Sequence, residues 1–516
     1  MSASTTTQDT TADGRAAATN PLLDTLVETG PATALLPLPE SEGRPVRVFG
    51  NAAIRRTFDH TTLRQVLNSR TAPGITDAVL NPDAHLGYGA PIGSVLASPT
   101  HIYPGPVGVD VKCSMSLLQF DLPAEAIEDR TVRRALINAI CERIPTGAGR
   151  GQRQARKSRR VHELMGRAAI VSGATKDVLE MLDIPRHWRH RCEDAVHTAH
   201  DGTPETLQKR LAWHEAAGTF RSLRGKVEQL GSLGGGNHFA ECEVVKTRDT
   251  DEARATAEAF GLRDGHVAFL THCGSRGLGN QLATHQFRTL QKKFEAWGTP
   301  FPAGDKHLVY APLGTPEAND YLDDMALAAN FATINHLLIN ALVLEAFREV
   351  LPGVEGELVY FISHNIAREE SVDGEPHQVM RKGATRAFPA GHPALRDTPF
   401  AETGHPILLP GDPRRGSAVM VGLPGAEASL YSVNHGAGRV LGRRAAIRSL
   451  DQQAVDTELA EADVLTNARK YPRDEAPAAY KDFAEVIASV EQAGLARTVA
   501  DLHARFVIKD SSAADD

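Results

Sequence analysis

Five glycine-rich blocks constrain this chain more than any other feature, because each places polar residues beside the end of a predicted strand. The blocks are GPVGVDVKC (105–113), LGGGNHFAE (233–241), THCGSRGLGNQ (271–281), ISHNIAREE (362–370) and VNHGAGR (433–439). Glycine lets a backbone approach a ligand closely, and bare backbone N–H groups suit phosphate. The blocks together indicate a metal site that also holds a phosphate-bearing ligand.

The side chains in these blocks are metal donors of three kinds. Asp110 and Cys113 lie three residues apart, and the later blocks add the histidines His238, His272, His364 and His435. One aspartate, one cysteine and three histidines would give five donors. Five donors exceed a single tetrahedral zinc site and suit two adjacent ions bridged by the thiolate. A mixed oxygen, nitrogen and sulfur set does not select one metal by affinity.

Strands and helices alternate irregularly, which predicts an α/β fold of the mixed α+β kind. We expect a single large body of mixed sheets with a helical insertion. Strands are expected at 46–50, 115–122, 266–270, 357–364 and 505–510, with short strands in AVMVGLP and SLYSVNH, and helices at 125–143 and 317–350. The apolar stretch from Met325 to Val350 contains Asn330, Asn335 and His336, so it is predicted to be a buried helix rather than a membrane span. Residues 371–416 are expected to be loop-rich.

Composition limits the remaining choices. Residues 1–20 are polar and predicted to be disordered, and residues 21–516 are predicted to form the catalytic domain, with a basic helical insertion at 150–228. The formal net charge of −8 means that any nucleic-acid surface must be a local basic patch. Five cysteines without paired spacing argue against a disulfide framework and favour the cytoplasm.

The blocks, in their order, resemble the signature blocks of the RtcB family of RNA ligases. The matching segments are PDAHLGYGAPIG, GVDVKC, LGGGNHFAE, HCGSRGLG, SHNIAREE, RKGATRAFP and NHGAGR, and the resemblance covers residues 45–510. It implies an enzyme that joins an RNA 3′-phosphate or 2′,3′-cyclic phosphate end to a 5′-hydroxyl end, using GTP and two Mn²⁺ ions. It further implies a monomer without membrane contact, and leaves open the need for an archease-like activator.

The resemblance also implies a role for each matching residue. Asp110, Cys113, His238, His272 and His364 would bind manganese, and His435 would be the nucleophile that takes up GMP. The guanylate contacts would be Asn237, His238, Phe239, Glu241, His364, Asn365, Pro410, Gly411, Asp412, Ser417, His435, Gly436, Ala437, Gly438 and Lys509. Arg381, Lys382 and Arg386, from RKGATRAFP, are expected to contact phosphate.

One departure from the family pattern keeps other functions open. This chain reads PGDPRRG (410–416) where the family reads PGSMG, so Asp412 replaces a serine that contacts the nucleotide. A carboxylate near a phosphate would repel it, and Arg414 and Arg415 are expected to offset that repulsion. The alternative is a metal-dependent RNA-end phosphohydrolase or cyclic phosphodiesterase without guanylylation. A third hypothesis is a catalytically silent RNA-binding protein. The complete set of metal donors argues against it, because such a protein does not need a bridging thiolate.

Overall fold

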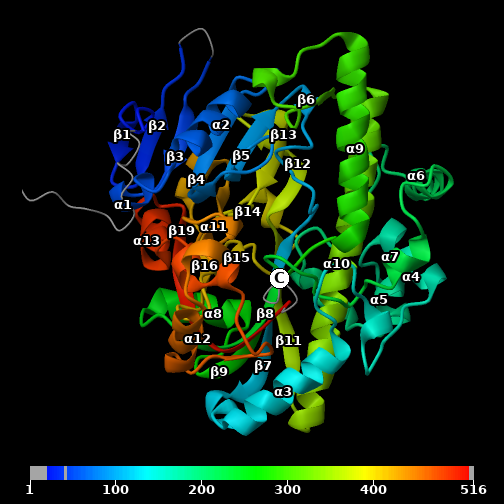
Figure 1. Ribbon diagram of the computed structural model, residues 1–516, viewed down its shortest axis with the longest axis vertical. Coiled ribbons are helices and arrows are strands. Elements are labelled where there is room, and N and C mark those ends of the chain that lie inside the picture. Colours follow the sequence, from blue (N-terminus) through cyan, green and yellow to red (C-terminus); the bar gives the residue numbers. More distant parts are fainter. Residues whose placement is uncertain (1–19, 40–42, 511–516) are drawn as a thin grey trace, which may run out of the picture.

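The computed structural model of the chain describes residues 20–39 and 43–510. The predicted disorder of residues 1–20 therefore falls, apart from Asn20, outside the described residues. Figure 1 shows a single body in which two large sheets are flanked by helices, which confirms the predicted mixed α/β fold.

The first large sheet has seven strands. Its order is β1 (Val27–Gly30), β2 (Thr33–Leu36), β3 (Val46–Phe49), β4 (Asp77–His85), β5 (Ile92–Ser98), β13 (Glu375–Lys382) and β12 (Asn365–Val372). Only the β3–β4 pair is parallel. Helix α2 (His60–Arg70) packs against β4, and the short helix α1 (Ala52–Arg55) packs against α13 (Phe483–Gln492). Because β12 and β13 come from the second half of the chain, this sheet joins distant segments.

The second large sheet carries the predicted strand ends. Its order is β11 (Gly356–Ser363), β7 (Ser114–Pro123), β9 (His266–Cys273), β8 (Phe239–Thr247), β19 (Ala496–Lys509), β16 (Ser417–Gly422) and β15 (Pro406–Pro410), with β18 (Leu465–Thr466) paired to β19. Two small sheets pair β14 (Ala384–Arg386) with β17 (Ser432–Asn434), and β6 (His101–Ile102) with β10 (Ala311–Pro312). The 14-residue β19 lies between β8 and β16, so a late segment of the chain occupies an interior position in the sheet.

Helix α10 (Pro316–Val350) is the long central helix of the molecule. It packs against α3 (Arg130–Arg143), α9 (Arg276–Trp297), α4 (Glu163–Ser172) and α6 (Pro204–Ala216). It is long and apolar enough to cross a membrane, yet the residues of its most apolar window are all buried inside the protein. Its buried asparagines and His336 are hydrogen-bonded internally; Asn335, for example, donates to the carbonyl of Ser232. The prediction of a buried helix is confirmed.

Several predicted boundaries differ from the structure, and the largest difference for a strand is at 505–510, since that strand already begins at Ala496. The helix expected from residue 125 begins at Arg130, because Asp129 caps it by accepting a hydrogen bond from the N–H of Thr131. The stretch 371–416 is not simply loop-rich, since it contains β13, β14 and β15. Strand β13 reads EPHQVMRK, whose many polar residues conceal a segment that is buried over its last six positions between β5 and β12.

The remaining helices lie outside the sheets. They are α5 (Lys176–Met181) and α7 (Leu223–Val227) in the 150–228 region, and α8 (Asp251–Phe260), α11 (Arg443–Ser449) and α12 (Gln452–Glu461) elsewhere. The 150–228 region is largely helical and packs on α10 through α4 and α6. Its identity as an insertion into a catalytic domain stays a prediction.

Candidate active site

The topology of the second sheet brings four predicted metal ligands to one edge. Cys113 precedes β7 and His238 precedes β8, whereas His272 lies near the end of β9 and His364 directly follows β11. Strands β11, β7, β9 and β8 are consecutive neighbours and antiparallel. The start of each strand therefore lies beside the end of the next one, and the four side chains meet.

The first group of ligands consists of Asp110, Cys113 and His238. His238 Nε2 lies 2.8 Å from Asp110 Oδ2 and 3.6 Å from Cys113 Sγ. Burial alone would raise the pKa of Asp110, but the charge of His238 lowers it to about 2. Burial would likewise lower the pKa of His238, yet Cys273 and Asp110 raise it to about 10. The site between these side chains thus favours a positive charge, which a metal ion can supply in place of the proton.

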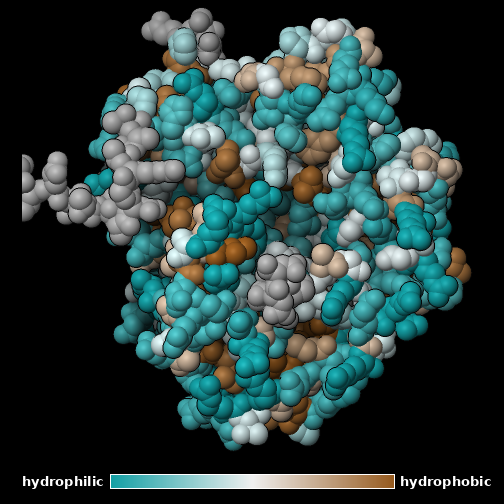
Figure 2. All heavy atoms as spheres, in the orientation of Figure 1, coloured by the Kyte–Doolittle hydropathy of each residue, from teal (hydrophilic) through white to brown (hydrophobic). Residues whose placement is uncertain are grey.

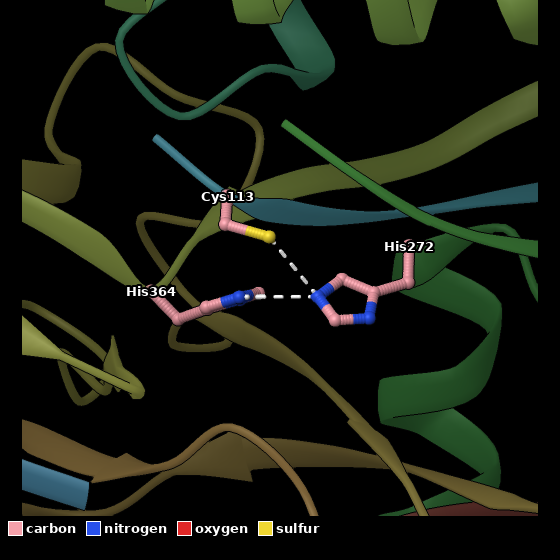
Figure 3. Close-up of side chains that lie close together, drawn as sticks. All are labelled: Cys113, His272 and His364. Carbon is pink, nitrogen blue, oxygen red and sulfur yellow. Dashed lines mark hydrogen bonds between the residues drawn. The ribbon is translucent and has the colours of Figure 1, made fainter. Parts of the chain in front are cut away.

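The second group consists of Cys113, His272 and His364. His272 Nε2 lies 3.1 Å from Cys113 Sγ and 3.3 Å from His364 Nε2, and Figure 3 shows the sulfur and the two rings facing one another. Burial lowers the pKa of His272 and of His364 well below the usual range, so both rings are neutral and able to bind a metal. Cys113 belongs to both groups.

Backbone carbonyls orient two of the three histidines. The Nδ1 atom of His238 lies 3.0 Å from the carbonyl oxygen of Leu233, and that of His272 lies 3.1 Å from the carbonyl oxygen of Asn237. When Nδ1–H donates to such a carbonyl, Nε2 presents its lone pair, and this arrangement is typical of histidine metal ligands. The donor chemistry and the convergence of the atoms fit two cations bridged by the Cys113 sulfur.

His435 lies beside the second group. Its ring centroid is 4.6 Å from that of His364. Its Nδ1 lies 2.7 Å from Asp83 Oδ2 and 2.9 Å from the carbonyl oxygen of Gly383. Both partners are acceptors, so Nδ1–H donates to them and Nε2 is the ring nitrogen on the opposite side. This orientation leaves Nε2 as the atom of His435 that could act as a nucleophile.

Asp83 is a site residue that the sequence analysis missed. Its side chain is fully buried, and Lys481 fixes the strand around it by donating to the carbonyls of Pro82 and Ala84. A Cβ at Gly438 would lie 2.2 Å from the carbonyl oxygen of Asp83, and Gly438 has a φ of +74°, so this position requires glycine. The sequence signal for Asp83 is the PDAH segment, which belongs to one of the blocks that resemble the family.

The residues predicted to contact guanylate lie on neighbouring strands and on the loop after His435. They are Phe239 and Glu241 on β8, Pro410 and Gly411 at the end of β15, Ser417 at the start of β16, Lys509 at the end of β19, and Gly436, Ala437 and Gly438; Asn237 precedes β8. Asn365 starts β12, where its Nδ2 donates to the carbonyl of Asp110 and its Oδ1 accepts from the N–H of Gly383. Asn365 thus ties the metal loop to the segment that orients His435.

Glu241 and Lys509 are two buried side chains among the predicted guanylate contacts. Burial, followed by the charge of Asp412, raises the pKa of Glu241 to about 8. Within the described part of the chain, Glu241 Oε1 has no hydrogen-bond partner, and a ligand N–H group would satisfy it. Lys509 Nζ lies 2.7 Å from Glu475 Oε2 and over the ring of Phe239.

The structure gives Asp412 a local role. Its Oδ1 accepts hydrogen bonds from the backbone N–H groups of Arg414 (3.0 Å) and Arg415 (3.1 Å), so the carboxylate caps its own turn. The side chains of Arg414 and Arg415 pair with Glu458 and Asp482, and their charges also act on Asp412, where they oppose the rise in pKa that burial causes. The turn and the two arginines therefore both reduce the repulsion expected from this substitution.

Three cations expected to contact phosphate are engaged elsewhere. Arg381 is fully buried and forms an ion pair with Glu370, and Arg386 pairs with Glu370 and Asp194. Lys382 donates to the backbone carbonyls of Tyr88 and Ala90. In this structure these side chains brace the scaffold around the site, and none of them is free for a phosphate.

The chain is similar to known proteins over most of its length. A family model described as "tRNA-splicing ligase RtcB" matches residues 65–510. The chain is 35% identical to a "tRNA-splicing ligase RtcB" of Thermococcus kodakarensis over 483 residues, which cover 90% of this chain and 94% of the relative. It is 34% identical to a protein of the same name from Pyrobaculum aerophilum, with 88% and 92% covered. It is 35% identical to an "RNA-splicing ligase RtcB" of Mycobacterium tuberculosis, with 85% and 98% covered.

Proposed function

This chain belongs to the tRNA-splicing ligase RtcB family and is an RNA ligase, and from that premise we propose a GTP- and manganese-dependent reaction. The reaction joins an RNA 3′-phosphate or 2′,3′-cyclic phosphate end to a 5′-hydroxyl end through a His435–GMP intermediate. The observation that carries the proposal is the position of His435, whose Nδ1 is held by Asp83 and whose ring lies 4.6 Å from that of His364, a candidate metal ligand.

Five side chains would hold the metal. Asp110, Cys113 and His238 form one three-ligand group, and Cys113, His272 and His364 form the other. Two Mn²⁺ ions in these groups would offset the negative charge that develops on phosphoryl oxygens. The choice of manganese comes from the family resemblance, because this mixed donor set does not select one metal.

His435 performs the first step of the proposed reaction. Its Nε2 attacks the α-phosphorus of GTP, an N–P bond forms, the bond from the α-phosphorus to the bridging oxygen breaks, and pyrophosphate leaves. The Nδ1 proton stays on the ring, and the Asp83 carboxylate stabilises the positive charge that the ring gains. Asp83 acts here as a positioning residue.

Two transfers complete the ligation. An oxygen of the RNA 3′-phosphate attacks the phosphorus bound to His435, which forms a P–O–P anhydride and frees the histidine. The 5′-hydroxyl of the other RNA end then attacks the activated 3′-phosphorus, loses its proton and displaces GMP, leaving a 3′,5′-phosphodiester. A 2′,3′-cyclic phosphate end first takes up one water to become the required 3′-phosphate.

We assign the guanylate to the region between His435 and Lys509. Glu241 supplies a buried acceptor for a base N–H group, and the buried Lys509, which is paired with Glu475, acts electrostatically on Glu241. Phe239, Asn237, Asn365, Pro410, Gly411, Asp412, Ser417, Gly436, Ala437 and Gly438 line the same region in this proposal. A monomeric state, a cytoplasmic location and an archease-like activator remain predictions from the family resemblance.

The test is incubation of the purified protein with α-³²P-labelled GTP and MnCl₂, followed by a denaturing gel. An acid-labile, base-stable label on the protein is expected, because a histidine–phosphate bond has that stability profile. If metal and GTP bind but no label forms, the first step is missing, and the phosphohydrolase or cyclic phosphodiesterase reading replaces the ligase mechanism.

Replacing Asp83 by asparagine should slow GMP labelling by about 10²–10⁴-fold, because an amide can fix the wrong tautomer of His435 and cannot stabilise its positive charge. Metal content should be unchanged, since Asp83 belongs to neither ligand group. The measurement is the single-turnover labelling rate, with Asp59→Asn, a change in the cap of α2, as the control. A labelling rate within threefold of the natural protein's would contradict the role of Asp83.

A further inference from the structure

We propose that the rings of Tyr88 and His307 form a platform on which a base of the RNA end stacks, so that the platform positions the end for reaction at His435. The proposal deepens the proposed ligase function and rests on it. The occupant is a nucleobase of a single-stranded RNA terminus.

Tyr88 is exposed on a loop whose backbone is tightly held. Its side chain is 71% exposed, and the nearby Leu86 is 50% exposed. Gln65 bonds both sides of Gly87, by accepting from its N–H and by donating to its carbonyl. Ser69 donates to the carbonyl of Gly89. Because the backbone is fixed at successive residues, the loop presents its apolar side chains outward in a set position.

A second ring, from a different segment, lies beside Tyr88. The centroids of Tyr88 and His307 are 5.4 Å apart, with the ring planes inclined at 50°, and the His307 side chain is half-exposed. Glycines allow this approach, since a Cβ at Gly89 or at Gly105 would lie 2.6 Å or 2.3 Å from the carbonyl oxygen of His307. Exposed aromatic and histidine rings of this kind are how many proteins hold unstacked RNA bases.

Lys382 connects this platform to the proposed chemistry. Its ammonium group donates to the carbonyl of Tyr88, while the next residue, Gly383, accepts from His435 Nδ1. A Cβ at Gly108, two residues before Asp110, would lie 3.7 Å from Lys382 Cε. One lysine side chain therefore separates the Tyr88 loop from the segment that orients His435. The loop that carries Asp110 also lies beside this lysine.

One face of the molecule is hollowed and hydrophilic. Figure 2 shows a mostly hydrophilic face with a hollow near its centre, in the area where Figure 1 shows β12, β14 and α10. Brown, apolar atoms form only small separate patches on this face. Stacking on a pair of exposed rings is tolerant of sequence, because every base has a π face. The platform would thus grip RNA ends without selecting their sequence.

The test compares Tyr88→Ala with Tyr88→Phe and Tyr88→Trp. Tyr88→Ala should raise the KM for RNA ends, and the Kd of a 3′-phosphate oligonucleotide by fluorescence anisotropy, about tenfold or more. Labelling by GTP should keep its rate, since that step precedes RNA binding. The phenylalanine and tryptophan variants should restore KM. The control is Trp297→Ala, which likewise removes an exposed aromatic ring, 48% exposed, at the end of α9 remote from Arg276.

Substrates lacking one base make the test specific for stacking. An RNA with an abasic nucleotide at the 3′ or the 5′ terminus should bind the natural protein as weakly as normal RNA binds Tyr88→Ala. The abasic change should have little further effect in Tyr88→Ala. An unchanged Kd in Tyr88→Ala would overturn the platform. So would a double change in which the abasic RNA weakens binding to Tyr88→Ala as much as it weakens binding to the natural protein. Failure of GTP labelling in the natural protein would contradict the ligase mechanism alone, because the anisotropy measurement scores stacking without it.

Discussion

Replacing His435 by alanine should abolish covalent GMP labelling and RNA ligation, with a loss of about 10⁴-fold or more. The reason is geometric. Asp83 and Gly383 occupy the Nδ1 side of the ring, so the only lone pair that this histidine can offer is on Nε2. Loss of the ring removes that lone pair, and the neighbouring His364 is already committed to the candidate metal group. The measurement is labelling by α-³²P-labelled GTP on a denaturing gel.

The control for this prediction separates chemistry from folding. His435 is in neither ligand group, so the alanine variant should retain its metal, measured by elemental analysis, and its melting temperature should stay within a few degrees. His60→Ala, at an exposed position at the start of α2, should label normally. Persistent labelling of the His435 variant would show that another residue is the nucleophile.

The second large effect is expected from Cys113→Ala. Cys113 is the only residue common to the two ligand groups found among the described residues, so its removal breaks both of them at once. Without the sulfur, each group retains two protein ligands. We expect the manganese content to fall from two ions per chain to one or none, and ligation to fall by at least ~10³-fold.

The matched control is Cys141→Ala, since Cys141 is a free, half-buried cysteine on α3, away from the metal groups. It should leave metal content and ligation unchanged. In thermal unfolding, Mn²⁺ is expected to stabilise the natural protein but not Cys113→Ala. Two ions per chain in this variant would refute the bridging arrangement, whatever the ligation activity.

Much of the candidate site could be predicted from the sequence, because the end of a strand can be recognised from the few residues around it. Cys113, His238, His272 and His364 each stand beside a short apolar run that forms a strand of the second sheet. Glycines next to the donors marked the places where the backbone turns. The order of strands in the sheet, which brings these donors to one edge, could not be read from the runs themselves.

The parts that escaped prediction depend on contacts between distant residues. Asp83 and His435 are 352 positions apart, and nothing local to either residue indicates their hydrogen bond. Arg386 looked like a phosphate contact, but its partners Glu370 and Asp194 come from other strands and loops. A cationic side chain in a family motif can therefore stabilise the scaffold, and only the fold shows which carboxylate it meets.

The interior position of β19 has a consequence for folding during synthesis on the ribosome. One edge of β8 pairs with β9, but its other edge pairs with β19, and facing residues such as Thr247 and Ala500 are separated by about 250 positions. At about 5–20 residues per second, the ribosome needs on the order of 10–50 s to make the intervening chain. During that time the second edge of β8 has no strand to pair with, and an unpaired edge is a template for aggregation. The nascent chain should therefore depend on chaperones most strongly between the synthesis of β8 and that of β19.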